Sequence, residues 1–240
     1  VYKRQVMGYI NYGGYDWTTK NTAVVTYRDG TPIPQVSDSN EWINLTTGAW
    51  CFYDNNPEKG ILYNWYAVMG IHDNDPNTDN KEFAPEGWRV PSDQDWALFE
   101  NFLILNGYNY DGSQSENKIA KAMASKFGWN NSSQQGSPGN NPSINNDSGF
   151  NAYPNGGRIA NGTFRDFSQN AVFWSSTEYD DNHSWNRDLN ADNAFFAKSY
   201  GVKNYGKSVR FVREAVVPKQ SLDDFSVSYQ YVDCLLYTSD

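Results

Sequence analysis

The polarity of the chain changes twice between Ala171 and Arg213, where two apolar runs flank a polar and aromatic stretch. Phe173–Glu178 and Gly206–Arg213 combine aromatic and β-branched residues, and the second run alternates apolar with basic side chains, which predicts two strands. Tyr179–Tyr205 lies between them, is rich in Asn, Asp, Ser, Tyr and Phe, and has almost no aliphatic periodicity. We interpret the strands as a scaffold that presents this polar and aromatic stretch as a variable surface.

Apolar side chains recur at helical spacing in one other part of the chain. Ser92 is a suitable N-cap, and Trp96, Phe99 and Leu103 follow at positions that share one face of a helix. A second, shorter helix is expected over residues 117–126.

The remaining pattern predicts short elements joined by polar loops. We expect two strands with a Gly-Gly turn over 5–25 and a short helix over 37–44 with Trp42 and Ile43 turned inward. Other expected elements are a strand over 49–53, a buried strand or helix over 60–68, a long surface loop over 128–149, and a strand, turn and strand over 149–164.

The two ends of the chain are interpreted as artefacts. Residues 1–5 and 234–239 can be encoded by DNA strings that are almost reverse complements of one another, which resembles the adapter of transposase-based sequencing libraries read through in frame. We therefore predict artefacts at 1–5 and 234–240, one domain over 6–214, and a linker or the start of a further module over 215–233. The alternative is two native ends that coincide in this way.

Composition favours an aromatic core and an extracellular setting. Aromatic residues make up 16% of the 240 residues, including nine Trp and 17 Tyr, and they bury a large area each. The net charge of −9 argues against a nucleic-acid partner, and no apolar run is long enough for a membrane span. The high content of Asn, Gly, Ser and Tyr resembles that of extracellular or particle-surface proteins.

Candidate chemistry is sparse, and we predict that the protein is not an enzyme. Cys51 is interpreted as a small core residue, and His72 is not interpreted as a metal ligand. The acidic loop 72–80 lacks the Gly and closing Glu of the familiar calcium loop, so a solvated loop is favoured, with calcium kept as a possible cofactor. No credible Ser/His/Asp set and no phosphate-binding Gly loop is present, so no catalytic or metal residue is predicted.

Eight motifs in a fixed order carry a family resemblance. They are Trp17 with Asn21, Gly30–Pro34, Leu62–Val68, Gly87–Ser92 with Trp96, Ser148–Phe150, Gly157–Arg158, Trp174–Glu178, and Ser208–Arg210 with Val212–Arg213. Over residues 8–214 the chain resembles the Fibrobacter succinogenes major paralogous domain, which is similar to the C-type lectin fold and to formylglycine-generating enzymes. The resemblance implies an α+β domain, with two helices packed on twisted antiparallel sheets and long loops, on a bacterial surface protein.

The chain departs from the two better-known activities of that fold. Sugar-binding C-type lectins use a Glu-Pro-Asn or Gln-Pro-Asp loop to hold calcium and carbohydrate, and neither tripeptide occurs here. Formylglycine-generating enzymes need paired cysteines, which Cys51 alone does not supply. Both activities are therefore disfavoured, and fold alone assigns none.

A second resemblance concerns the residues between the two predicted strands. Diversity-generating retroelements rewrite adenines, so an Asn codon can become Tyr, Asp, His, Ser or Phe but not Glu, Gln or Met, and residues 179–205 contain none of the last three. The alternative is a plain polar region in an ordinary family member. The predicted ligand-binding residues are Tyr179, Asp180, Asp181, His183, Ser184, Asn186, Asp188, Asn190, Asp192, Phe195, Phe196, Tyr200, Asn204 and Tyr205.

These observations together predict a non-enzymatic binding domain on a bacterial cell surface or a phage particle. Its face formed by residues 179–205 would recognise a cell-surface protein or glycan, and Tyr, Asn and Ser suit such recognition by combining rigid area with adaptable hydrogen bonds. One alternative is a structural or assembly module of a cell-surface lipoprotein. An oxidase-like enzyme is disfavoured because the cysteines are lacking.

Overall fold

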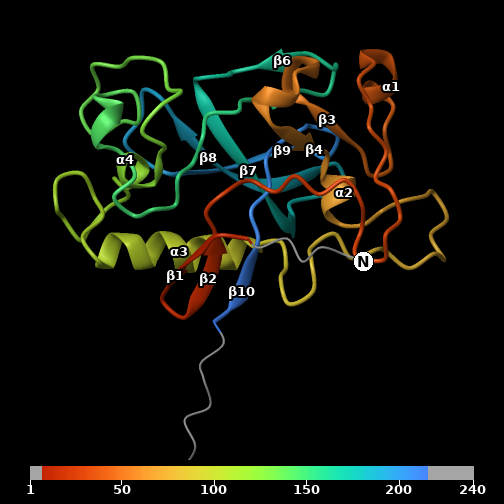
Figure 1. Ribbon diagram of the computed structural model, residues 1–240, viewed down its shortest axis with the longest axis horizontal. Helices are drawn as coiled ribbons and strands as arrows, with labels where there is room; N and C mark the ends of the chain where they lie inside the picture. The colour runs from red at the N-terminus through yellow and green to blue at the C-terminus, as the bar shows by residue number, and fades with distance from the viewer. Residues whose placement is uncertain (1–6, 216–240) are drawn as a thin grey trace, which may run out of the picture.

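The computed structural model describes residues 7–215 of the chain (Figure 1). The segments interpreted as artefacts, Cys234, and almost all of the predicted linker lie outside the described residues. The elements in chain order are β1 (Tyr9–Tyr12), β2 (Tyr15–Thr18), α1 (Ser39–Ile43), β3 (Trp50–Phe52), η1 (Tyr53–Asn55), η2 (Pro57–Lys59), β4 (Ile61–Tyr63), α2 (Trp65–Val68), α3 (Asp93–Leu105), α4 (Ala120–Met123), η3 (Pro142–Ile144), β5 (Gly157–Arg158), β6 (Phe164–Arg165), β7 (Asn170–Glu178), β8 (His183–Asn190), β9 (Ala197–Val202) and β10 (Val212–Glu214).

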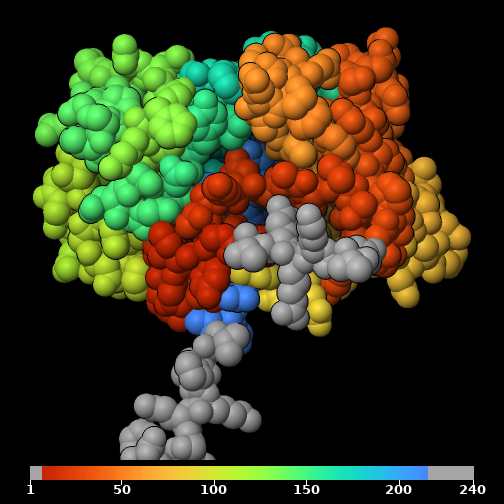
Figure 2. All heavy atoms as spheres, viewed as in Figure 1, coloured from red at the N-terminus to blue at the C-terminus, as the bar shows by residue number. Residues whose placement is uncertain are grey.

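The strands form small antiparallel sheets, which together with the short helices confirm an α+β fold. One three-stranded sheet has the order β1-β2-β10 and another the order β7-β8-β9, and β3-β4 and β5-β6 are two-stranded. Helix α3 runs beneath the β7-β8-β9 sheet in the view of Figure 1. Figure 2 shows the N-terminal segment, in red, crossing the front surface between its green and orange parts.

Helix α3 begins where the sequence predicts. The Ser92 hydroxyl accepts a hydrogen bond from the backbone N–H of Asp95, and the Asp95 carboxylate accepts one from the backbone N–H of Ser92, which completes a capping box. The predicted apolar face is buried through Trp96, Phe99 and Leu103. Through this face, helix α3 packs against β7 and β8 of the β7-β8-β9 sheet.

Other expectations need correction. The helix expected over 117–126 is only α4, because Ala124 is extended and pairs with Ala152. Within 206–213 only β10 belongs to a regular sheet, because Gly206, Lys207 and Ser208 each form an isolated bridge to a different segment of the chain. Ile43 was expected to point inward but is 44% exposed, while Trp42 beside it is fully buried.

The interior is aromatic, as the composition predicts. Trp17 lies at the centre of the largest cluster, with its ring 4.6 Å from Trp96 and 4.7 Å from Phe99. Aromatic pairs at such centroid distances contribute beyond the area that they bury. The cluster joins the β1-β2-β10 sheet, α3 and the β7-β8-β9 sheet into one core.

The long loop over 128–149 is held from within. Residues 136–139 are buried, and the ammonium of Lys121 donates hydrogen bonds to the carbonyl oxygens of Asn140 and Asn141 and to Asn145 Oδ1. The sequence predicts a long surface loop here, and this prediction needs correction, because part of the loop is buried within the fold.

Buried arginines hold other irregular segments. Arg210, 1% exposed, donates to the carbonyl oxygens of Thr18, Phe150 and Asn151 at 2.6, 3.0 and 3.0 Å and to Asn21 Oδ1 at 2.7 Å. Each of these carbonyls needs a donor, because a buried acceptor without one is costly. Arg210 thus joins the N-terminal segment to the residues around Phe150.

We expect Arg210→Lys to destabilise the protein by about 3 kcal/mol, because an ammonium cannot span the four acceptors that the guanidinium reaches. Urea unfolding followed by tryptophan fluorescence measures the change. Arg165→Lys, at an exposed position, is the matched control and should change the free energy of unfolding by less than about 0.5 kcal/mol. Equal losses in the two variants would contradict the role given to Arg210.

Candidate functional site

The segment between the two predicted strands is itself largely a pair of strands. β8 pairs with β7 on one side and with β9 on the other, so β9 has no further strand beside it among the described residues. Cross-strand partners share a face of the sheet, and neighbours along a strand lie on opposite faces. The candidate residues are consequently distributed over two faces instead of one.

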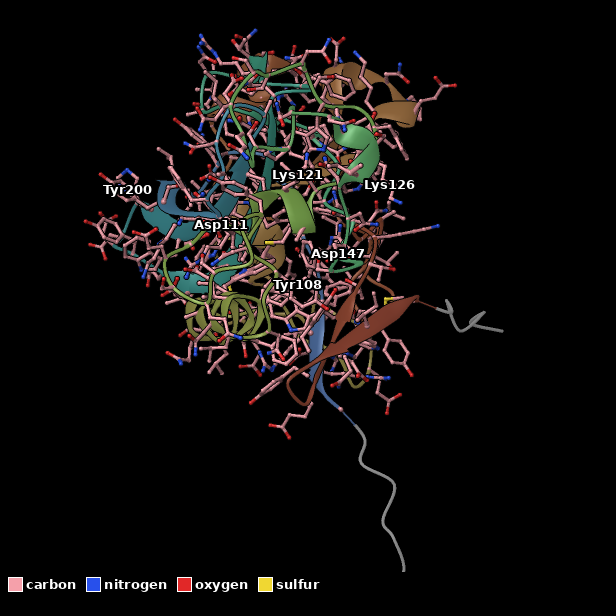
Figure 3. The ribbon with its side chains drawn as sticks, turned by 90° about the vertical axis from the view of Figure 1, so that its left-hand side faces the viewer. Tyr108, Asp111, Lys121, Lys126, Asp147 and Tyr200 are labelled. Atoms are coloured by element: carbon pink, nitrogen blue, oxygen red, sulfur yellow. The ribbon has the colours of Figure 1, made fainter. Side chains whose placement is uncertain are left out.

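One face carries an exposed group of rings at the β7–β8 turn, which we name the aromatic ridge. It consists of Tyr179, His183, Trp185 and Tyr200. The Tyr179 and Tyr200 rings stack at 4.4 Å and 10°, and Trp185 meets Tyr179 edge-on at 4.7 Å. Tyr179 is 46% exposed and Tyr200 54%, and Tyr200 projects from the edge of the molecule in Figure 3.

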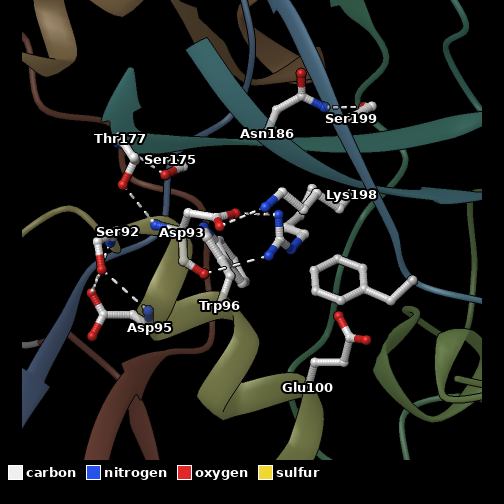
Figure 4. Close-up of polar contacts among 12 residues, drawn as sticks. Ser92, Asp93, Asp95, Trp96, Glu100, Ser175, Thr177, Asn186, Lys198 and Ser199 are labelled. Carbon is white, nitrogen blue, oxygen red and sulfur yellow. Dashed lines mark hydrogen bonds and ion pairs between the residues drawn. The ribbon is translucent and has the colours of Figure 1, made fainter. Parts of the chain in front are cut away.

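Charged side chains fix the ridge to the N-terminus of α3. Lys198 places its ammonium 3.9 Å from the centre of the Trp185 ring and 2.7 Å from Asp93 Oδ2 (Figure 4). Arg187, almost fully buried, lies with Nη1 2.6 Å from Asp93 Oδ1, in an ion pair that lacks hydrogen-bond alignment. Thr177 Oγ1 accepts a hydrogen bond from the Asp93 backbone N–H at 2.9 Å, so β7, β8 and β9 are all tied to Asp93.

The turn next to the ridge is also well held. Asp180 Oδ1 accepts hydrogen bonds from the backbone N–H groups of Asn182 and His183, which lower the pKa of Asp180 together with the His183 ring. Lys203 pairs with Glu178 and donates to the Asp181 carbonyl oxygen at 2.8 Å. The exposed rings therefore stand on an ordered backbone.

Four predicted ligand-binding residues are buried. Ser184 donates to the Thr177 carbonyl oxygen at 2.7 Å, and Phe196 packs against Trp96 at 5.6 Å. Asn186 and Asn204 hydrogen-bond to neighbouring side-chain and backbone atoms. Their exposed fractions are 0%, 1%, 2% and 9% for Ser184, Phe196, Asn186 and Asn204, so these side chains support the fold and do not reach the surface.

The other predicted residues divide into two groups. Asp188 and Tyr205 line a polar pocket of about 200 Å³ between the β5-β6 ribbon and the face of the sheet opposite the ridge, and Asn190 is half-buried at the end of β8. Burial raises the pKa of Asp188. Asp192 and Phe195 are exposed in the β8–β9 connection, at the other end of the hairpin from the ridge.

Sequence reasoning missed Trp185 as a site residue. Trp185 is absent from the predicted ligand-binding residues, yet its ring belongs to the ridge. Its pairing with Tyr200 across β8 and β9 depends on strand register, which the sequence does not disclose.

The remaining candidates show no assembled site. Within residues 7–215 no group of three or more His, Cys, Asp or Glu side chains is placed to hold a metal ion. In the acidic loop, Asp73 pairs with His72 at 3.2 Å and Asp75 accepts from the Asn77 backbone at 2.9 Å. Burial raises the pKa of Cys51 to about 11, which makes its thiol a poor nucleophile. None of the described helices has the length and apolarity to span a membrane.

Comparison with models of known protein families gives a match over most of the chain. The family model described as Fibrobacter succinogenes major domain matches residues 10–213. No curated protein and no solved structure matches the chain.

We expect Asp93→Asn to destabilise the protein by about 3 kcal/mol, because it leaves the buried Arg187 without its counter-charge. Thermal and urea unfolding measure the effect. Lys198→Met removes the more exposed partner of the same carboxylate and should cost less than about 1 kcal/mol. A loss for Lys198→Met as large as that for Asp93→Asn would show that the buried pair is not the main attachment.

Proposed function

The chain belongs to the Fibrobacter succinogenes major domain family, and we propose that within it this protein is a binding domain without enzymatic activity. The proposal places it on a bacterial cell surface or a phage particle, where it recognises a protein or a glycan. The Asn-, Ser- and Tyr-rich composition supports that location. The mixture of short helices and antiparallel sheets supports, for the finer fold, a C-type lectin-like arrangement.

The aromatic ridge is the observation that carries the proposal. Tyr179 and Tyr200 expose about half of their surface although apolar surface is normally buried, and exposed rings gathered in one place mark interaction sites. Aromatic side chains lose little conformational freedom on binding, and here stacking already restricts them. The ridge thus offers a preorganised anchor to a partner.

The ridge suits a protein groove or a sugar ring for the same physical reason. A Tyr or Trp ring presents a flat apolar surface beside polar groups, and Asp180, Asp181 and His183 supply those groups at the margin. The residues proposed to contact ligand are accordingly Tyr179, His183, Trp185 and Tyr200, with the two aspartates beside them.

A paired-variant binding experiment tests this proposal. Wild-type protein and the double variant Tyr179→Ala, Tyr200→Ala are applied to glycan arrays and to arrays of bacterial surface proteins. We expect the double variant to lose affinity by about tenfold or more for any ligand found, since central aromatic anchors dominate binding energy.

Phe127→Ala is the matched control, because Phe127 is 66% exposed in the loop after α4 and lies outside the ridge. Circular dichroism confirms that all variants are folded. Undiminished binding by the double variant, or an equal loss in Phe127→Ala, would reject the ridge as the binding site. An absence of ligands on every array would favour a structural or assembly module of a cell-surface lipoprotein.

We also propose that the exposed part of 179–205 is diversified by a retroelement. The absence of Glu, Gln and Met from the segment supports this proposal, and burial of Ser184, Asn186, Phe196 and Asn204 restricts which positions tolerate change. Deep sequencing of the locus in its source community is the test. We expect adenine-specific substitutions at exposed codons such as 179, 180 and 200 but few at the four buried ones, whereas uniform, mostly synonymous change would refute diversification.

A further inference from the structure

The opposite face of the β8-β9 hairpin contains a buried lysine next to a buried amide. Lys207 is 7% exposed and Asn186 2%, and the Lys207 ammonium nitrogen Nζ donates a hydrogen bond to Asn186 Oδ1. The carbon Cγ of Asn186 is one covalent bond from that oxygen, so the amine lies beside an amide carbonyl. Lys207 comes from the chain segment before β10, and Asn186 from the middle of β8.

Burial of the Lys207 side chain favours the neutral amine and outweighs Asp188 and the two nearby ring faces, which favour the cation. Nζ lies 3.9 Å from the centre of the Trp174 ring and 5.5 Å from that of Tyr205, and Lys207 forms no ion pair among residues 7–215. Burial lowers the pKa of Lys207 to about 7. A neutral amine in an apolar site is nucleophilic at neutral pH.

Hydrogen bonds connect the amide to a carboxyl group. Asn186 Nδ2 donates to Ser199 Oγ at 2.6 Å, a bond drawn in Figure 4, and Ser199 Oγ donates to Asp188 Oδ2 at 2.8 Å. Burial is the main reason that the pKa of Asp188 is raised, which increases the fraction of the protonated acid. The other charged groups at this pocket are Arg158, Arg165 and Asp166 on the β5-β6 side.

The backbone leaves space for this pair. Gly201 on β9 lies opposite Ser184, and a Cβ at position 201 would overlap Nζ of Lys207 and touch Asn186 Oδ1. A glycine at this position therefore permits the lysine to reach the amide.

We propose that Lys207 and Asn186 join in an intramolecular isopeptide bond. Nζ attacks Cγ of Asn186, the new Nζ–Cγ bond forms, and the Cγ–Nδ2 bond breaks. Nζ gives up one proton and the departing Nδ2 group gains one, so ammonia leaves and the product is a neutral secondary amide.

Asp188 and Ser199 are positioned to move that proton. Attack at Cγ gives Nδ2 a free lone pair, so both hydrogen bonds can reverse and the protonated Asp188 can pass its proton through the Ser199 hydroxyl to Nδ2. Nζ then releases its proton to water, and Asp188 regains one from water. No oxidant, metal or other reactant takes part, and only water and ammonia exchange with solvent. The inference is independent of the proposed binding function.

A second buried lysine provides an internal comparison. Lys121 also donates to a buried amide, Asn145 Oδ1, at 3.0 Å, but its ammonium is shared with the carbonyl oxygens of Asn140 and Asn141. Asn145 Nδ2 donates only to backbone carbonyl oxygens, so no acid is connected to it. The proposal therefore assigns the bond to Lys207 and not to Lys121.

The covalent bond would enclose β9 in a closed loop of the chain. β9 carries Tyr200 of the aromatic ridge, and its hairpin has no neighbouring strand on the outer side among the described residues. A link from residue 186 to residue 207 would attach both flanks of β9 to each other and limit its local opening.

Intact-mass spectrometry of the denatured protein tests the proposal. We expect the mass of wild-type protein, after incubation folded at pH 7.5, to be about 17 Da below the sequence mass, the loss of one ammonia. Trypsin should then fail to cleave after Lys207 and should release residues 166–187 covalently joined to residues 204–210. The variants Lys207→Arg and Asp188→Asn should show the full sequence mass, and Lys121→Arg should retain the loss.

Peptide mapping separates the outcomes. A wild-type mass equal to the sequence mass, with normal cleavage after Lys207, would overturn the proposal, and this reading does not depend on any variant folding. A loss of ammonia that persists in Lys207→Arg, or that maps to a succinimide or to Lys121, would overturn it equally.

Discussion

The fold depends on satisfying the carbonyl oxygens of irregular segments that lie inside it. Much of the chain is neither helix nor sheet, yet many of its turns are buried, and each buried acceptor without a donor costs about 1–3 kcal/mol. Long cationic side chains supply the donors. Arg210 joins segments near Thr18 and Phe150, Arg158 donates to the carbonyls of Val36, Ser37 and Gly162, and Lys121 organises the loop after α4. Aromatic rings complete these sites, since the Arg158 guanidinium lies 4.3 Å from the Trp42 ring.

The same constraint explains why an exposed aromatic ridge can be stable. The sheet under the ridge is attached through ion pairs of two buried cations: Arg187 with Asp93 from below, and Lys203 with the exposed Glu178 beside the turn. Those contacts do not involve the outer rings, so the outer positions are free to vary without removing the support. The contacts that attach the strands stabilise the fold, and we assign ligand recognition to the exposed rings of the aromatic ridge.

Some of this architecture follows from the sequence, and some does not. Helix α3 was predictable because Ser92 and the spacing of Trp96, Phe99 and Leu103 act within a few residues. The two strands β8 and β9 were not, because the buried positions of β8 include Ser184, Asn186 and Arg187 and the buried position of β9 is Gly201, so the alternation has almost no hydrophobic signal. The sequence therefore predicts a site on one face, whereas strand pairing places its residues on opposite faces and at opposite ends of the hairpin. The partner of a buried Arg lies far away in the sequence, and only the fold discloses it.

A polar interior also brings reactive groups together, and small differences decide what they do. Lys121 and Lys207 are both buried next to an asparagine amide. Burial lowers the pKa of both lysines, but three carbonyl-type oxygens share the Lys121 ammonium, whereas Lys207 has one amide oxygen as its acceptor. The Asn145 amide donates its hydrogen bonds to backbone carbonyl oxygens. The Asn186 amide donates one to the Ser199 hydroxyl, which in turn donates to the Asp188 carboxyl group. The first pair therefore has only a structural role, and the second has a nucleophile, an electrophile and a proton path in contact. The two lysine–asparagine pairs have the same residue types and similar burial. They differ in the number of hydrogen-bond acceptors around each lysine nitrogen.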